Sequence, residues 1–183
     1  MTLLVLGLVL WAGAHFFKRA APSVREPMGD KGKGIVALAL AVSVVLMVIG
    51  YRSAEVNDVL WIAPSFAYHA NNLIVLIAIF LMSPAPRKGK LFNNLRHPML
   101  LGFALWAVAH IWVNGDVPSV ILFGGLLAWA LAEIVVINKA EGPWEPTERG
   151  TIAKDGMFFV ASIVLMGVIG FIHGLVGPSP FGG

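Results

Sequence analysis

The stretch VPSVILFGGLLAWALAEIVVI, residues 117–137, decides the fold class. It runs for 21 residues and holds one charged side chain, that of Glu133. A helix needs about 20 apolar residues to cross the roughly 30 Å hydrocarbon core of a bilayer. Apolar and polar residues do not alternate along the stretch, so a helix is favoured over the strand of a membrane barrel. We therefore expect a membrane-spanning helix here.

Five further apolar runs flank this one. Of the 183 residues, 58% are hydrophobic and 13% are charged, which is more apolar surface than a soluble domain of this length hides in its core. Cysteine is absent, which excludes disulfide bonds, thiolate metal sites and iron–sulfur clusters. We expect an all-α fold, one integral membrane domain over residues 1–183, which forms a six-helix bundle with spans near residues 2–17, 34–51, 66–82, 98–113, 117–137 and 156–176.

The basic residues predict the orientation of this bundle. Twelve of the 13 Lys and Arg residues lie in the loops after the first, third and fifth runs, and Arg52 lies on the opposite side. The positive-inside rule then places these loops in the cytoplasm and both termini on the outer, periplasmic side. Because topology accounts for the formal charge of +3, we expect the lipid bilayer as a partner and no nucleic acid.

Two histidines within the predicted spans are the main candidates for chemistry, because ionisable groups inside a membrane are costly. His15 and His110 each follow a tryptophan by four residues, in the sequences Trp11-Ala-Gly-Ala-His15 and Trp106-Ala-Val-Ala-His110. Counted from the ends of their runs, the two histidines lie within roughly 6 Å of each other along the membrane normal. The small residues between Trp and His allow a neighbouring helix or a flat ligand to approach closely.

The residues alone leave three roles open for this pair. Two imidazoles near one depth could bind the two axial positions of a haem, hydrogen-bond a neighbouring helix, or relay protons. Zinc is disfavoured because no third ligand accompanies them. Arg96 and His97 precede the fourth run, and they either anchor its start or bind an anion such as a haem propionate. Glu133 lies near the inner end of its run, where we expect it to pair with an Arg or Lys of a loop.

The order of several short motifs resembles the NnrU family over about residues 3–135. The motifs are Leu10-Trp11 with His15, Pro22-Ser23-Val24-Arg25, Gly29-Asp30-Lys31-Gly32, Gly50-Tyr51-Arg52, Leu95-Arg96-His97-Pro98 with Gly102, Trp106-Ala107-Val108-Ala109-His110, Asn114-Gly115-Asp116 and Phe123-Gly124-Gly125. NnrU proteins are bacterial inner-membrane proteins associated with nitrite and nitric oxide metabolism in denitrifiers. The family is itself similar to the plant 15-cis-zeta-carotene isomerase, an integral membrane haem b protein with histidine axial ligands.

This resemblance implies a haem b cofactor whose iron is bound by His15 and His110. The other residues expected at the site are Trp11, Trp106, Arg96 and His97. The resemblance further implies a multi-pass protein of the bacterial inner membrane, with a respiratory or denitrification reductase as its partner. The plant enzyme has a cysteine near its second histidine, where this chain has Ala107, so a thiolate ligand is excluded here.

The sequence is therefore compatible with three functions from different classes. The first is a haem protein that supports nitrite or nitric oxide metabolism, or the redox-dependent cis–trans isomerisation of an apolar polyene. The second is a membrane methyltransferase of the isoprenylcysteine or phospholipid type, whose Arg-His-Pro motif is also present at 96–98, although Glu145 and Glu148 imitate its acidic pair poorly. The third is a non-catalytic assembly subunit of a respiratory complex. The sequence does not decide whether the protein is an enzyme.

Overall fold

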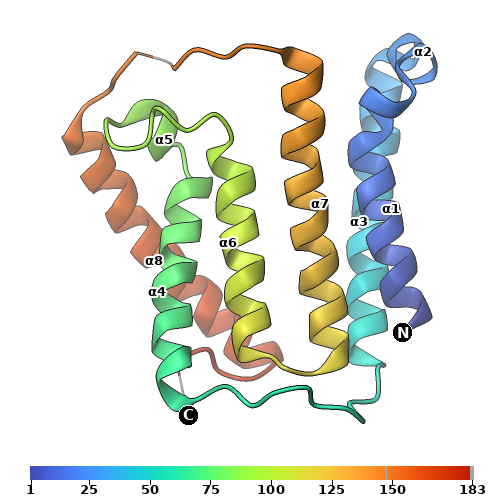
Figure 1. The fold of residues 1–183 in the computed structure, drawn as a ribbon, viewed down its shortest axis with the longest axis vertical. Helices are drawn as coiled ribbons and strands as arrows, with labels where there is room; N and C mark the ends of the chain where they lie inside the picture. Colours follow the sequence, from blue (N-terminus) through green and yellow to red (C-terminus); the bar gives the residue numbers. More distant parts are fainter. Residues whose placement is uncertain (147, 182–183) are drawn as a thin grey trace.

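The computed structural model describes residues 1–146 and 148–181, and these are almost entirely helical (Figure 1). Six long helices dominate: α1 (Thr2–Ala20), α3 (Gly29–Arg52), α4 (Ser65–Met82), α6 (Pro98–Val113), α7 (Val117–Glu141) and α8 (Ile152–Val176). The short helices α2 (Pro22–Arg25), η1 (Glu26–Met28) and α5 (Ala85–Lys88) lie in the connections. The described residues form no sheet, and an isolated antiparallel bridge joins Val59 to Asp116. The prediction of an all-α fold is confirmed.

Five of the long helices are long and apolar enough to cross a membrane, namely α1, α3, α4, α7 and α8. Helix α6 has 16 residues. At 1.5 Å per residue it is about 24 Å long, which is shorter than the hydrocarbon core. The chain is thus a multi-pass membrane protein, and the count of six spans remains a prediction.

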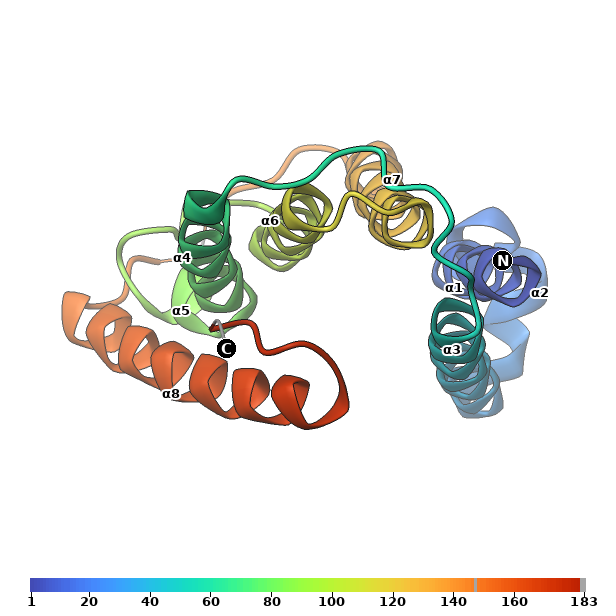
Figure 2. The same ribbon diagram turned by 90° about the horizontal axis from the view of Figure 1, so that it is seen from below.

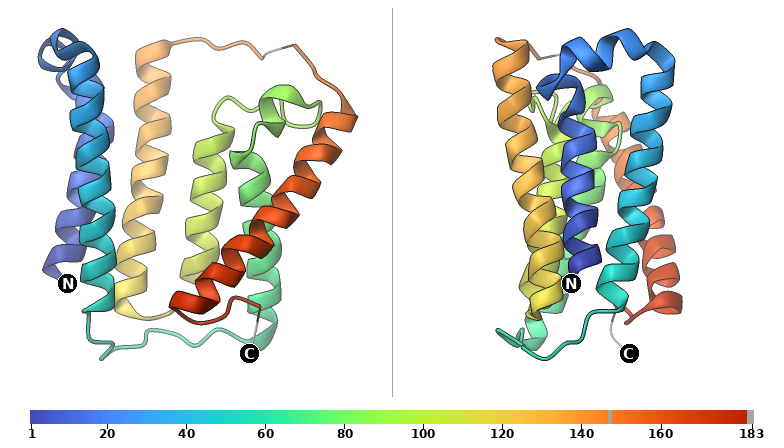
Figure 3. Two further views of the ribbon diagram at one scale, coloured as in Figure 1. Left: turned by 180° about the vertical axis from the view of Figure 1, so that it is seen from behind. Right: turned by 90° about the vertical axis from the view of Figure 1, so that its right-hand side faces the viewer.

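The helices stand in an open arc rather than a closed ring. In the view along the helices, α4, α6, α7 and α1 follow one another along the arc (Figure 2). Helix α3 packs on α1 at one end of the arc, and α8 crosses α4 at a slant at the other (Figure 3). Because α7 has α6 on one side and α1 on the other, it is central to any site that these helices share.

The start of α1 and the end of α8 lie at the same end of the molecule (Figures 1 and 3). The opposite end carries α2, α5 and the connection from α7 to α8 (Figure 1). These connections, with the helix ends beside them, hold all the Lys and Arg residues except Arg52, and we call this part of the molecule the basic end. Which side of the membrane it faces remains a prediction.

Small residues shape the close contact between α1 and α3. Leu4 and Gly7 of α1 and Ser43, Met47 and Gly50 of α3 are buried. A Cβ added at Gly50 would overlap the backbone of Leu4, and one added at Gly7 would lie 2.8 Å from the backbone nitrogen of Met47. Apolar burial does little to drive helices together in lipid, so close backbone approach of this kind is what holds such a pair.

Candidate functional site

The two histidines singled out in the sequence contact α7 from its two neighbouring helices. The ring of His15, on α1, lies 4.4 Å from that of Trp129 on α7, centroid to centroid. The ring of His110, on α6, lies 4.7 Å from that of Phe123 on α7. Each ring also packs on the tryptophan one turn earlier in its own helix, at 4.4 Å and 4.7 Å. Both histidines are half-buried.

Both imidazoles are held in the same way by their own helix. Nδ1 of His15 lies 2.9 Å from the backbone oxygen of Trp11, and Nδ1 of His110 lies 2.8 Å from that of Trp106. A carbonyl oxygen only accepts hydrogen bonds, so Nδ1 carries the proton and donates, and Nε2 of the neutral ring keeps its lone pair. Neither Nε2 has a hydrogen-bond partner among the described residues. In metal-binding histidines, too, one ring nitrogen donates a hydrogen bond and the other binds the metal.

The two imidazole rings contact different residues of α7. Their contacts on α7, Trp129 and Phe123, are six residues apart, which is about 9 Å along a helix axis. The offset of roughly 6 Å along the membrane normal expected from helical rise is of the same order. That estimate took Pro98 as lying at the membrane face, but α6 is short and His110 lies in its last turn. His15, in contrast, lies five residues before the end of α1.

Aromatic rings fill the space between the two histidines. Trp11 stacks on Phe103 of α6 at 6.3 Å, and Phe103 contacts Trp106 at 5.2 Å, centroid to centroid. Trp129 packs edge-on against Trp11 at 5.2 Å and against Phe103 at 5.4 Å. We call Trp11, Phe103, Trp106 and Trp129 the aromatic cluster. It joins α1, α6 and α7 and separates one imidazole from the other.

Two indole groups of the aromatic cluster have no acceptor for their N–H. Nε1 of Trp11 and Nε1 of Trp129 are buried without a hydrogen-bond partner in the described part of the chain. An indole nitrogen only donates, and buried donors are satisfied in the great majority of cases. A bound group with acceptor atoms between α1 and α7 would satisfy both.

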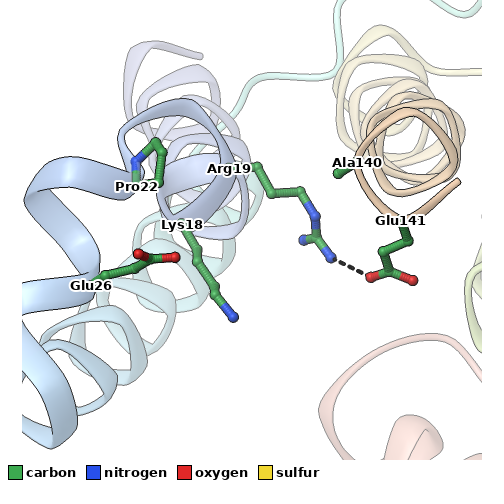
Figure 4. Close-up of a pocket in the computed structure, with 6 residues that line it drawn as sticks. All are labelled: Lys18, Arg19, Pro22, Glu26, Ala140 and Glu141. Carbon is green, nitrogen blue, oxygen red and sulfur yellow. Dashed lines mark hydrogen bonds and ion pairs between the residues drawn. The ribbon is translucent and has the colours of Figure 1, made fainter.

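A network of ion pairs lies at the basic end of α1 and α7. Arg19 of α1 donates from Nη1 to Oε1 of Glu133 at 2.9 Å and from Nη2 to Oε1 of Glu141 at 3.4 Å. Figure 4 shows the second of these pairs. The expectation that Glu133 pairs with a basic residue is confirmed, but Arg19 belongs to the last turn of α1 and not to a loop. An open recess of about 320 Å³ adjoins Arg19, and its lining residues are Lys18, Arg19, Pro22, Glu26, Ala140 and Glu141 (Figure 4).

Arg96 and His97 join the start of α6 to the end of α7. Arg96 donates from Nη1 to the backbone oxygen of Gly142 at 2.6 Å, and its Nη2 lies 3.7 Å from Oε2 of Glu141. Nε2 of His97 lies 2.8 Å from Oδ1 of Asn138, to which it donates. Nε of Arg96 is buried without a partner among the described residues. Anion binding at these two residues stays a prediction.

Sequence reasoning missed Trp129, although a signal for it was present. Trp129 precedes Glu133 by four residues, just as Trp11 precedes His15, and residues four apart lie on one face of a helix. The remaining histidines of the predicted spans, His69 and His173, are exposed. Within residues 1–146 and 148–181, no group of three or more His, Cys, Asp or Glu side chains could hold a metal ion.

Comparison with known proteins places the chain in a family. A family model described as "NnrU protein" matches residues 3–180. The match therefore extends beyond the ordered motifs of residues 3–135 and takes in all of α8. No curated protein and no solved structure matches the chain.

Proposed function

The chain belongs to the NnrU family, and from that membership we propose that it is a haem b-binding protein of the bacterial inner membrane, with His15 and His110 as ligands of the iron. Its proposed role is in nitrite and nitric oxide metabolism or in the redox-dependent cis–trans isomerisation of an apolar polyene. When bound, haem supplies an iron centre that takes up small ligands and changes oxidation state.

The matched setting of the two imidazoles carries this proposal. His15 and His110 each donate Nδ1–H to a tryptophan carbonyl and leave Nε2 without a partner in the described residues. Such a hydrogen bond fixes the tautomer and the ring orientation and makes the other nitrogen a better ligand. Nε2 of His15 and Nε2 of His110 are therefore both suited to bind iron. The unpartnered indole N–H groups of Trp11 and Trp129 support a bound group with acceptor atoms beside His15.

The two histidines contact α7 at different levels. The residues that they contact on α7 are about 9 Å apart along the helix, and the rings of the aromatic cluster link the two sites. Each imidazole would hold the iron through its unpartnered Nε2, and haem would supply a centre that takes up a small molecule such as nitric oxide.

The absorption spectrum of the purified protein tests the proposal. Protein from haem-replete cells should show a Soret band and a positive pyridine haemochrome assay. His15→Ala and His110→Ala are compared with His69→Ala, a control at an exposed histidine. Loss of the band in one of the two variants identifies a single ligand, and loss in each of them identifies a pair. Colourless wild-type protein, or a band that survives in both variants, would refute the proposal.

The geometry of the site supports the methyltransferase and assembly-subunit functions less well. Arg96 and His97, the motif residues of the methyltransferase hypothesis, bond Gly142 and Asn138, and no contact of theirs favours methyl transfer. A respiratory or denitrification reductase remains the proposed partner, which co-purification from denitrifying membranes tests. A haem-free protein that co-purifies with such a reductase would favour the assembly-subunit function instead.

A further inference from the structure

Glu133 is a buried acid within the apolar part of α7. Its side chain is 7% exposed. It lies eight residues before the end of the helix, which is about 12 Å along the axis. Acidic residues at such positions are costly, and they mark ion or proton pathways. The haem proposal makes no use of Glu133.

The carboxylate of Glu133 is paired through one oxygen. Oε1 accepts from Nη1 of Arg19 at 2.9 Å, whereas Oε2 is buried with no hydrogen-bond partner among the described residues. Arginine and carboxylate groups commonly pair through two parallel bonds, but Arg19 directs its second nitrogen to Glu141 at 3.4 Å. Oε2 is therefore open to a proton, whose uptake would remove the cost of keeping a charged, unbonded oxygen out of water.

Among residues 1–146 and 148–181, the charged and titratable groups nearest Glu133 come from α1. Arg19 forms the ion pair, and His15 lies one turn earlier on α1. His15 packs on Trp129, which lies one turn before Glu133 on α7. The His15–Trp129 contact and the Arg19–Glu133 contact are thus successive layers between the same two helices. Glu141 lies two turns further along α7, beside the recess at the basic end.

We propose that Glu133 is a proton-binding site that connects the basic end with the ligand position beside His15. A proton from water in the recess binds Oε2 and converts the carboxylate into the neutral acid. Release of that proton toward a group bound beside His15 restores the carboxylate, which Arg19 then neutralises again. One proton moves and no electron does, so the step is balanced by the water that loses the proton and the acceptor that gains it. The identity of the acceptor rests on the proposed function, whereas protonation of Glu133 does not.

Infrared difference spectra test the protonation, recorded on the full-length protein in lipid vesicles from mildly acidic to mildly alkaline pH. The neutral acid gives a carboxylic C=O band. We expect a pH-dependent band that Glu133→Gln abolishes and that Glu141→Gln retains, since Glu141 is the exposed partner of the same arginine. If Glu133→Gln does not accumulate, Glu133→Asp keeps the acid and should shift the band. A wild-type protein without such a band at any pH, or a band unchanged in Glu133→Gln, would show a permanently charged partner of Arg19 and overturn the proposal.

Deuterium exchange of the same band tests the route. Ala140→Leu narrows the recess, whereas Ala132→Leu adds the same bulk at an exposed position of α7 outside it. Exchange should be several-fold slower in Ala140→Leu and unchanged in Ala132→Leu, and equal rates in the two variants would overturn entry through the recess. Haem content is measured on the same samples and should not change in Glu133→Gln. Failure of the haem proposal and failure of the proton site are therefore separate outcomes.

Discussion

The contact between α1 and α3 should weaken when Gly50 is replaced by alanine. The added Cβ would overlap the backbone of Leu4, and backbone atoms cannot move aside as a flexible side chain can. Overpacking of this kind costs about 1–3 kcal/mol. Alanine is about 1 kcal/mol more favourable than glycine inside a helix, so the net loss of unfolding free energy should be at most about 2 kcal/mol.

Gly34→Ala is the matched control in the same helix, because a Cβ at Gly34 meets nothing within 4 Å. It has the helical gain of alanine without the clash, so Gly34→Ala should be more stable than Gly50→Ala by about 1–3 kcal/mol. Reversible unfolding in mixed micelles, followed by tryptophan fluorescence, measures this difference. Equal stabilities of the two variants would refute the idea that backbone contact holds α1 to α3.

Three further variants probe polar contacts. At a pH where Glu133 stays charged, Arg19→Ala leaves it buried without its cation and should cost about 3–5 kcal/mol, whereas replacing both residues by leucine should cost less; equal losses in unfolding assays would contradict this. Asp155→Ala removes the carboxylate that accepts from the backbone nitrogen of Lys90 at 2.7 Å, at a cost of about 1–3 kcal/mol. Trypsin should then cleave faster in the loop before α6, and an unchanged rate would count against the contact. Asp116→Ala removes the side-chain cap of α7 and should lower stability by about 1 kcal/mol, with Asp116→Asn close to wild type in thermal unfolding.

Apolar runs predicted where each long helix lies, including both ends of α6 and the last residues of α4 and α8, but they missed polar turns at other helix ends. Helix α7 continues four residues past the predicted end at 137, to Glu141, and Glu141 is held there by Arg19 and Arg96. Helix α3 begins at Gly29, five residues before the predicted start at 34. Its first turn is polar and contains the ion pair of Asp30 with Lys33. A run of apolar residues marks only the part of a helix that lies in the hydrocarbon core. It therefore does not include helical turns with polar residues outside that core.

The arrangement of the candidate site was less predictable than its members. The positions of His15 and His110 one turn after a tryptophan follow directly from helical spacing. Their separation does not, because it depends on the lateral order in which α7 stands between α1 and α6. The pairing of Glu133 was predictable, because a buried acid requires a cation and Arg19 follows the first run.

Because the helices stand in an open arc, few of their side chains are buried within the protein, and α8 is an example. Only 11% of its most apolar window is buried within the protein, so acyl chains take the place that neighbouring side chains occupy in a globular core. The thickness and fluidity of the surrounding membrane then act on this helix much as a core substitution acts on a soluble protein. For such a molecule, lipid composition is a structural variable in its own right, comparable with the amino-acid sequence.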